Sequence, residues 1–158
     1  PGNVNGLSVN SVSKAGNVFS VQAIRSYSDK LTGLAQDCLK ESVEIARTVV
    51  ENICPDCCGK HYHIHFAEGA VPKDGPSAGL ATTLAILSCE TGKVIDSKTA
   101  YTGEIDIFGN IWAVGAVAEK VSAAISTGCT RIFIPAQNYE HEVEMFSELK
   151  NDNIKIIG

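Results

Sequence analysis

Hydrophobic and polar residues follow patterns that predict strands alternating with helices along the chain. Two alternating runs around a glycine-containing turn predict an opening hairpin, and hydrophobic residues at helical spacing predict a long helix that ends before Pro55. Residues 26–32 are polar, and we expect a loop there. The other expected elements are strands at 4–9, 18–24 and 61–69, helices at 35–53, 78–91, 117–128 and 139–149, two short strands within 99–115, and strands at 131–136 and 154–157.

Strands that alternate with helices are typical of an α/β or α+β domain. The chain has 158 residues, enough for one domain with a hydrophobic core and few to spare for a second. The sequence contains no internal repeat, low-complexity tract or linker. We therefore expect a single domain over residues 1–158.

Composition and charge narrow the classes of function. Hydrophobic residues make up 44% of the chain, and no apolar run approaches the roughly 20 residues that a membrane helix needs. The net charge is −5 and the 13 lysines and arginines are scattered, which argues against nucleic acid as a partner. The N-terminus resembles no signal peptide, so we expect a reduced, intracellular chain. Because residue 1 is not methionine, we expect a piece of a longer protein.

The stretch EGAVPKDGPSAGLATTLAIL, residues 68–87, combines prolines, glycines and a serine just before a helix of small residues. Pro72 and Pro76 fix the backbone, and Ser77 stands at the junction with the helix. The first turn of a helix has free backbone N–H groups and the positive end of the dipole, which favour an oxyanion. Ser77 is therefore a candidate nucleophile. The alternative is that it only caps the helix.

A serine nucleophile needs a base that takes its proton. No local motif pairs Ser77 with a histidine, and a proline-containing loop replaces the strand that leads into the G-x-S-x-G elbow of hydrolases. Lys120 lies about 60° from the centre of the hydrophobic stripe of its helix, beside alanines. Burial there would lower its pKa and provide a neutral amine. The alternative is that its stem covers the core while its charge stays in water.

Cysteine and histidine gather in CPDCCGKHYHIH, residues 54–65. Cys-x-x-Cys followed by histidine is a zinc-like spacing, so a small metal-stabilised binding module is the main non-enzyme hypothesis. A zinc clip formed by Cys54, Cys57, Cys58 and His61 and a disulfide in this loop both remain open.

These motifs together resemble the proteolytic domain of the Lon family of ATP-dependent proteases. HIHFAEGAVPKDGPSAG is similar to the serine motif of that family, and YTGEIDIFGNIWAVGAVAEKVSAA to the segment that carries its lysine. RIFIPAQN, VNGLSV and LKESVEIARTVV resemble the following strand, the opening strand and the first long helix. The resemblance covers most of the chain and implies a compact α+β domain with short sheets and packed helices.

Residue by residue, the resemblance implies that Ser77 is the nucleophile and Lys120 the general base. It implies that Thr102 hydrogen-bonds and orients the lysine, and that Asp74 helps to organise or occlude the site. The expected activity is a Ser-Lys endopeptidase for unfolded or damaged proteins, without a metal in the site. The intact set of Ser77, Lys120 and Thr102 argues against an inactive domain that serves as a binding platform.

The family's His-x-His strand corresponds to His63 and His65, whose alternation places both on one face, and we expect a structural or interfacial role for them. Ala116 stands where the family commonly has the second glycine of Gly-Gly-Leu-Lys-Glu-Lys, a position where a special backbone conformation can matter. The chain also stops before the family's usual last helix, so we expect a trimmed or shortened member.

The resemblance also implies partners that this chain does not contain. No G-x-x-x-x-G-K-[ST] phosphate loop occurs in the sequence. We therefore expect an ATPase module N-terminal to Pro1 that uses ATP and Mg, and no cofactor in this chain. We also expect a hexameric ring, no membrane and no nucleic-acid partner, and a cytoplasmic location, or the mitochondrial matrix in a eukaryote.

Overall fold

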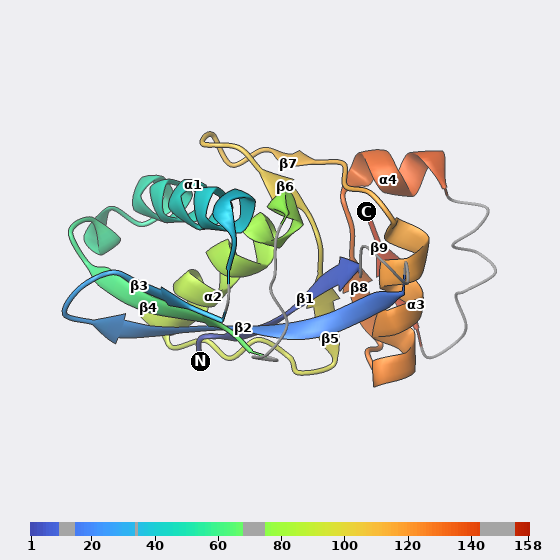
Figure 1. The fold of residues 1–158 in the computed structure, drawn as a ribbon, viewed down its shortest axis with the longest axis horizontal. Helices are drawn as coiled ribbons and strands as arrows, with labels where there is room; N and C mark the ends of the chain where they lie inside the picture. Colours follow the sequence, from blue (N-terminus) through green and yellow to red (C-terminus); the bar gives the residue numbers. More distant parts are fainter. Residues whose placement is uncertain (10–14, 34, 68–74, 143–153) are drawn as a thin grey trace.

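The computed structural model describes residues 1–9, 15–33, 35–67, 75–142 and 154–158. A seven-stranded sheet in the order β3-β4-β2-β1-β5-β8-β9 forms its centre, and β6 and β7 form a separate two-stranded sheet (Figure 1). The strands are β1 (Asn3–Val9), β2 (Gly16–Ser26), β3 (Lys30–Thr32), β4 (His61–Phe66), β5 (Thr99–Tyr101), β6 (Glu104–Ile105), β7 (Ile111–Trp112), β8 (Arg131–Phe133) and β9 (Lys155–Ile157). The helices are α1 (Asp37–Ile53), α2 (Gly79–Thr91), α3 (Val117–Thr127) and α4 (Ala136–His141), with 3₁₀ turns η1 (Pro55–Cys57) and η2 (Pro76–Ala78). The α+β class is confirmed.

Because most strands of the large sheet run in the same direction, the segments that follow them in the chain begin at one edge of the sheet. β2 pairs antiparallel with both β1 and β4, whereas β3–β4, β1–β5, β5–β8 and β8–β9 are parallel pairs. Within this seven-stranded sheet, the carboxyl ends of all strands except β2 therefore lie at the same edge. In sheets with parallel strands, ligands bind beyond the carboxyl ends of the strands. The segment after β4 leads to η2 and α2, and the segment after β5 leads through β6 and β7 to α3.

Two hydrophobic clusters cover the two faces of this sheet. Val4 of β1 and its cross-strand partner Val21 belong to the cluster beneath α1 and α2. Leu7 and its partner Val18 belong to the cluster beneath α3, because successive residues of a strand point to opposite faces. α1 packs on α2, and α2 and α3 each pack on β1 and β2 (Figure 1). α2, which follows the turn of Ser77, and α3, which carries Lys120, therefore approach the same strands from opposite sides.

The ends of the helices follow local signals in the sequence. α2 is followed by Gly92 and α3 by Gly128, both with left-handed backbone at φ 72° and φ 101°. Glycine adopts this conformation without the steric cost of a Cβ, which makes it the usual residue at a helix C-terminus. Pro55 follows α1 closely. The predicted ends of these three helices are thus confirmed.

Three predictions about the elements need correction. Residues 26–32 contain β3, because pairing with β4 and packing of Leu31 on the core stabilise a segment that looks like a loop locally. Residues 99–115 contain three short strands and not two, since β5 joins the large sheet. The helix predicted at 139–149 begins earlier, at Ala136, and residues 143–149 lie outside the described residues.

Every described helix is too short or too polar to span a bilayer.

Candidate active site

Ser77 lies in η2, the 3₁₀ turn that runs directly into α2. Pro76 begins this turn, and Gly75 before it has a φ of 116°, a conformation that residues with a Cβ rarely adopt. The side chain of Ser77 is half-buried. In this described segment no side chain caps the start of η2 or of α2, so helix capping does not account for the serine.

The backbone of the serine turn is held by the segment that follows β5. The N–H of Gly103 donates to the carbonyl oxygen of Ser77 at 3.1 Å, and the N–H of Leu80 donates to the carbonyl oxygen of Gly103 at 3.2 Å. A Cβ on Gly79 would lie 2.7 Å from Cγ2 of Ile105, so the absence of a side chain lets α2 pack directly against β6. Gly103 is a site residue that the sequence analysis missed.

Thr102 lies in the short connection from β5 to β6, and it is completely buried. Its N–H donates to the carbonyl oxygen of Phe133 at 3.1 Å, which extends the pairing of β5 with β8. Its hydroxyl oxygen Oγ1 is buried and has no hydrogen-bond partner among the described residues. The hydrogen bond predicted from Thr102 to Lys120 is therefore not formed in this structure. An unpaired buried polar group costs about 1–3 kcal/mol, so this hydroxyl is available for a partner.

Lys120 lies in α3 with only 4% of its surface exposed. The burial of Val117 and Val121 on the same helix shows that the lysine faces the protein interior. Burial lowers the pKa of Lys120 to about 8, and the nearby carboxylate of Glu119 raises this pKa by less than burial lowers it. No ion pair to Lys120 is found within the described part of the chain. The alternative in which the ammonium remains in water is wrong.

Ala116 precedes α3 as its N-cap residue, with φ 54° and ψ 39°. It is the one non-glycine residue with positive φ in the described ranges. The left-handed conformation costs a residue with a Cβ about 1–2 kcal/mol. The carbonyl oxygen of Ala116 accepts the N–H of Lys120 at 3.1 Å, so this conformation directly begins the turn that carries the lysine. The expectation of a special backbone at this position is confirmed.

Ser77 and Thr102 lie in segments that are hydrogen-bonded beyond the carboxyl end of β5, whereas Lys120 approaches the sheet from its other face. Gly103 directly follows Thr102 in the chain, and its hydrogen bond to the carbonyl oxygen of Ser77 joins this segment to the serine turn. Lys120 comes from the opposite face, where Val117 and Val121 pack in one cluster with Ala100 of β5. Asp74 lies outside the described residues.

The histidines of β4 contact the neighbouring edge strand. The hydroxyl of Thr32 lies 2.9 Å from Nε2 of His63 and 2.7 Å from Nδ1 of His65, both within hydrogen-bonding distance. These contacts join β3 to β4, where Thr32 and His65 are register partners. This arrangement agrees with the structural role expected for the pair.

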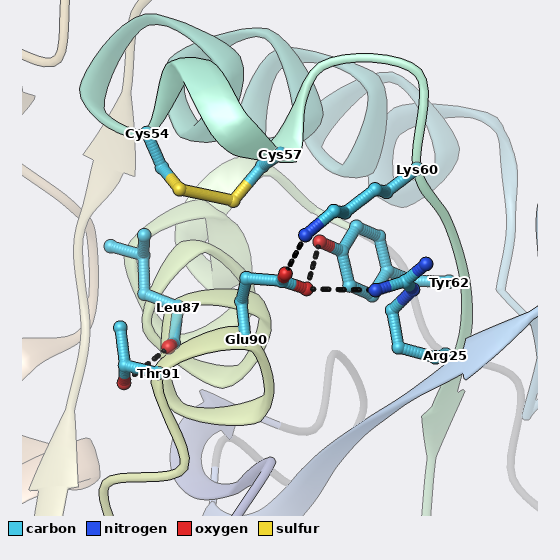
Figure 2. Close-up of a disulfide and its surroundings, with 8 residues drawn as sticks. All are labelled: Arg25, Cys54, Cys57, Lys60, Tyr62, Leu87, Glu90 and Thr91. Atoms are coloured by element: carbon cyan, nitrogen blue, oxygen red, sulfur yellow. Dashed lines mark hydrogen bonds and ion pairs between the residues drawn. A yellow bond between two sulfur atoms is a disulfide. The ribbon is translucent and has the colours of Figure 1, made fainter.

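The cysteine cluster forms a disulfide. Cys54, after the last turn of α1, is bonded to Cys57 of η1 (Figure 2). Zinc binds thiolates and not the sulfurs of a disulfide, so of the two alternatives left open for this loop the disulfide is found and the zinc clip is wrong. The expectation of a fully reduced chain is also wrong for this pair, whereas Cys58 is free and exposed. Within the described ranges, no group of three or more His, Cys, Asp or Glu side chains could hold a metal ion.

A polar cluster lies beside the disulfide at the C-terminal end of α2. The carboxylate of Glu90 accepts hydrogen bonds from the amine of Lys60 and, at 2.7 Å, from the hydroxyl of Tyr62, and it lies 3.5 Å from the guanidinium of Arg25 (Figure 2). The hydrogen bonds from Lys60 and Tyr62 hold the pKa of Glu90 below its usual range. The cluster ties α2 to β2 and β4 and is structural.

The sequence of this chain is similar to that of known proteases. The family model of the Lon protease (S16) C-terminal proteolytic domain matches residues 1–157. The Lon protease of Paraburkholderia phytofirmans is 44% identical over 115 residues, 68% of this chain and 14% of that protein. The Lon protease of Campylobacter jejuni is 34% identical over 179 aligned positions, 99% of this chain and 22% of that protein. The Lon protease of Phenylobacterium zucineum is 36% identical over 160 aligned positions, which cover 95% of this chain and 20% of that protein.

The chain thus spans between 14% and 22% of the length of these relatives, whereas the family model covers nearly all of it. The serine turn, the buried lysine and the left-handed residue before it lie within the matched region. The chain therefore belongs to the family of Lon protease (S16) C-terminal proteolytic domains.

Proposed function

We propose that this protease domain hydrolyses peptide bonds of unfolded or damaged polypeptides, with Ser77 as the nucleophile and Lys120 as the general base. The observation that carries the proposal is the buried amine of Lys120, whose pKa of about 8 lies far below that of a lysine in water. With this pKa, Lys120 is neutral in a minority of the protein molecules at pH 7 and in the majority of them above pH 8. A base for a serine hydroxyl must be in this state.

The proposed reaction has two half-cycles. The neutral amine of Lys120 accepts the proton of Ser77 as Oγ attacks the scissile carbonyl carbon, which requires an Oγ–Nζ distance of about 2.6–3.2 Å. The ammonium then protonates the leaving amine, and the acyl group stays on Ser77. Water next donates its proton to Lys120 and attacks the acyl group, and Ser77 recovers its proton as it leaves.

The oxyanion of the tetrahedral intermediate is proposed to bind backbone N–H groups of the serine turn and of the loop before it, because the N–H groups of Gly79 and Leu80 already donate to Pro76 and Gly103. Amides in the first turn have no acceptor within the helix, and the helix dipole favours negative charge there. A donor of this kind commonly contributes about 3–4 kcal/mol. The hydrogen bond from Gly103 to the carbonyl oxygen of Ser77 supports the proposal because it fixes the orientation of this turn.

Thr102 is proposed as a positioning residue for Lys120, and Asp74 as a residue that organises or occludes the site. The buried, unpaired hydroxyl of Thr102 supports the first role, since a hydrogen bond to the lysine amine would remove the cost of leaving that hydroxyl unpaired. The amine would thereby be held in one orientation.

The full protein is proposed to supply what this chain lacks. Because the chain covers about a fifth of its relatives' length, an ATPase module elsewhere would use ATP and Mg to unfold substrates. We propose a hexameric ring of such chains in the cytoplasm, or in the mitochondrial matrix of a eukaryote, without a membrane or nucleic-acid partner. No cofactor is proposed for the protease domain itself.

Digestion of an unfolded casein-like substrate and of a stably folded protein, each with and without ATP, tests this proposal. We expect slow cleavage of the unfolded substrate, the same rate with ATP, and no cleavage of the folded one. Labelling by a fluorophosphonate, followed by peptide mass spectrometry, should place the adduct on Ser77. Absence of cleavage over a wide range of enzyme concentrations, or an adduct on another serine, would overturn the proposal.

A further inference from the structure

The β6–β7 hairpin presents four large hydrophobic side chains to solvent. The exposed fractions are 49% for Ile107, 83% for Phe108, 48% for Ile111 and 49% for Trp112. Side chains of this size expose together on the order of 500 Å². A contiguous apolar patch of a few hundred Å² on a soluble domain is commonly a binding site.

The carboxylate of Asp106 organises this hairpin. Oδ1 accepts the backbone N–H groups of Phe108 at 3.0 Å and Asn110 at 2.9 Å. Oδ2 accepts Nδ2 of Asn110 at 3.1 Å and Nε1 of Trp112 at 2.9 Å. Four hydrogen bonds on one carboxylate fix both the turn and the direction of the indole ring. The hydrophobic residues are therefore held in a defined arrangement.

The hydrophobic surface begins beside Ser77. Gly103, which donates to the carbonyl oxygen of Ser77, is also the residue on which Ile111 packs. A Cβ on Gly103 would lie only 2.9 Å from Cγ2 of Ile111. Gly103 thus joins the serine turn to Ile111 of β7, while Trp112 projects from the opposite face of the hairpin and donates to Asp106.

We infer that the β6–β7 hairpin binds hydrophobic side chains of the polypeptide substrate, with Asp106 as the residue that positions it; this rests on the proposed function. A substrate segment fits the patch better than a second copy of the chain does, because each partner of a standard interface buries about 800 Å². The patch also adjoins the proposed nucleophile. Unfolded polypeptides expose hydrophobic side chains that folded proteins bury, so the hairpin favours unfolded substrates.

Trp112 is the only tryptophan of the chain, so its fluorescence reports on the hairpin directly. The Ser77→Ala variant is titrated with a leucine- and phenylalanine-containing dodecapeptide and with a serine- and glutamine-containing one of equal length. We expect a saturable shift of the emission to shorter wavelength with the first peptide only, because binding removes water from the indole. Fluorescence anisotropy of a dye on each peptide measures binding independently.

Kinetics of the wild-type chain and two matched variants provide the second test. Phe108→Ser should raise KM for the hydrophobic peptide about tenfold and leave kcat within twofold, because its ring contributes ground-state and transition-state binding equally. Val94→Ser removes a side chain that is 74% exposed outside the hairpin, and should leave both constants within twofold. Asp106→Asn should raise KM and alter the emission of Trp112 in the free protein.

The outcomes separate this inference from the proposed function. Binding of the hydrophobic peptide by anisotropy without a change in Trp112 emission, or equal KM values for Phe108→Ser and wild type, would overturn the inference while cleavage remained intact. If the Trp112 emission shifted with increasing protein concentration in the absence of peptide, the hydrophobic patch would instead bind a second copy of this chain, and the inference would be overturned. If the hydrophobic peptide shifted the Trp112 emission as expected but the wild-type chain cleaved no substrate, the proposed function would be overturned and this inference would stand.

Discussion

The backbone N–H of Gly103 donates a hydrogen bond of 3.1 Å to the carbonyl oxygen of Ser77. The two residues belong to segments distant in the sequence, the turn that begins α2 and the chain that leaves β5. The bond fixes the serine turn from outside its own helix, and the same short segment contains the buried Thr102 and leads into the β6–β7 hairpin. The proposed nucleophile is thus held by the connection that also begins the proposed substrate surface.

Ser77→Ala should abolish peptide cleavage and leave the fold intact. Loss of a nucleophile typically lowers kcat by a factor on the order of 10³ or more, whereas removal of one half-buried hydroxyl changes stability little. Rates with a fluorogenic peptide and thermal unfolding are the measurements. Ser126→Ala, on the exposed side of α3, is the control and should retain the wild-type rate. Wild-type cleavage by Ser77→Ala would assign the nucleophile elsewhere.

The activity should rise with pH through the ionisation of Lys120. The amine acts as a base only when neutral, and its pKa is about 8, so kcat/KM should increase up to that pH and then level off. Lys120→Arg should be at least about 100-fold less active at every pH, because arginine stays protonated. Rates measured between pH 6 and pH 10 test this. A flat profile, or an inflection near the ordinary lysine value, would contradict the role of burial.

Burial of Lys120 should also appear in the stability of the fold. The pKa of about 8 in the folded chain is below the ordinary value of 10.5, so the unfolded chain binds more protons between these two pH values. Stability therefore rises as the pH rises from about 8 toward 10.5. Lys120→Met, which has no such titration, should be about 2–4 kcal/mol more stable at pH 7.

Urea unfolding of both proteins at pH 7 and pH 9.5 measures this difference. The advantage of the methionine variant should shrink at the higher pH, because the lysine is then mostly neutral in the folded chain. A difference that stayed constant with pH would show that packing, and not the lost charge, explains the gain.

Ala116→Gly should raise the free energy of unfolding by about 1 kcal/mol, since glycine adopts positive φ without the strain of a Cβ. Ala118→Gly, inside α3, should lower it by up to about 1 kcal/mol, because glycine is a poor helix former. Chemical denaturation of both variants gives the two values. Equal destabilisation by both substitutions would mean that the left-handed backbone at Ala116 carries no strain.

Local patterns in the sequence were sufficient for several parts of this protein. The alternating runs around the first turn predicted β1 and β2, and the helical stripe before Pro55 predicted α1. Gly92 marked the end of α2. The motif around Ser77 and the segment before Lys120 resembled the Lon family, and the family model over residues 1–157 confirms that resemblance. The strands, α1 and the end of α2 depend on backbone preferences and on spacing within a few residues, which a single sequence contains, whereas the family followed from the resemblance of whole motifs.

The tertiary structure decided the features that depend on contacts between distant segments. β3 exists because β4 pairs with it, and Gly103 matters because α2 begins beside it. For Lys120, spacing alone allowed either a solvated ammonium or a buried amine. Packing of α3 on the sheet buried the amine, and the low polarity of that interior lowers its pKa. Desolvation depends on everything that surrounds a side chain, and only the folded chain brings those neighbours together.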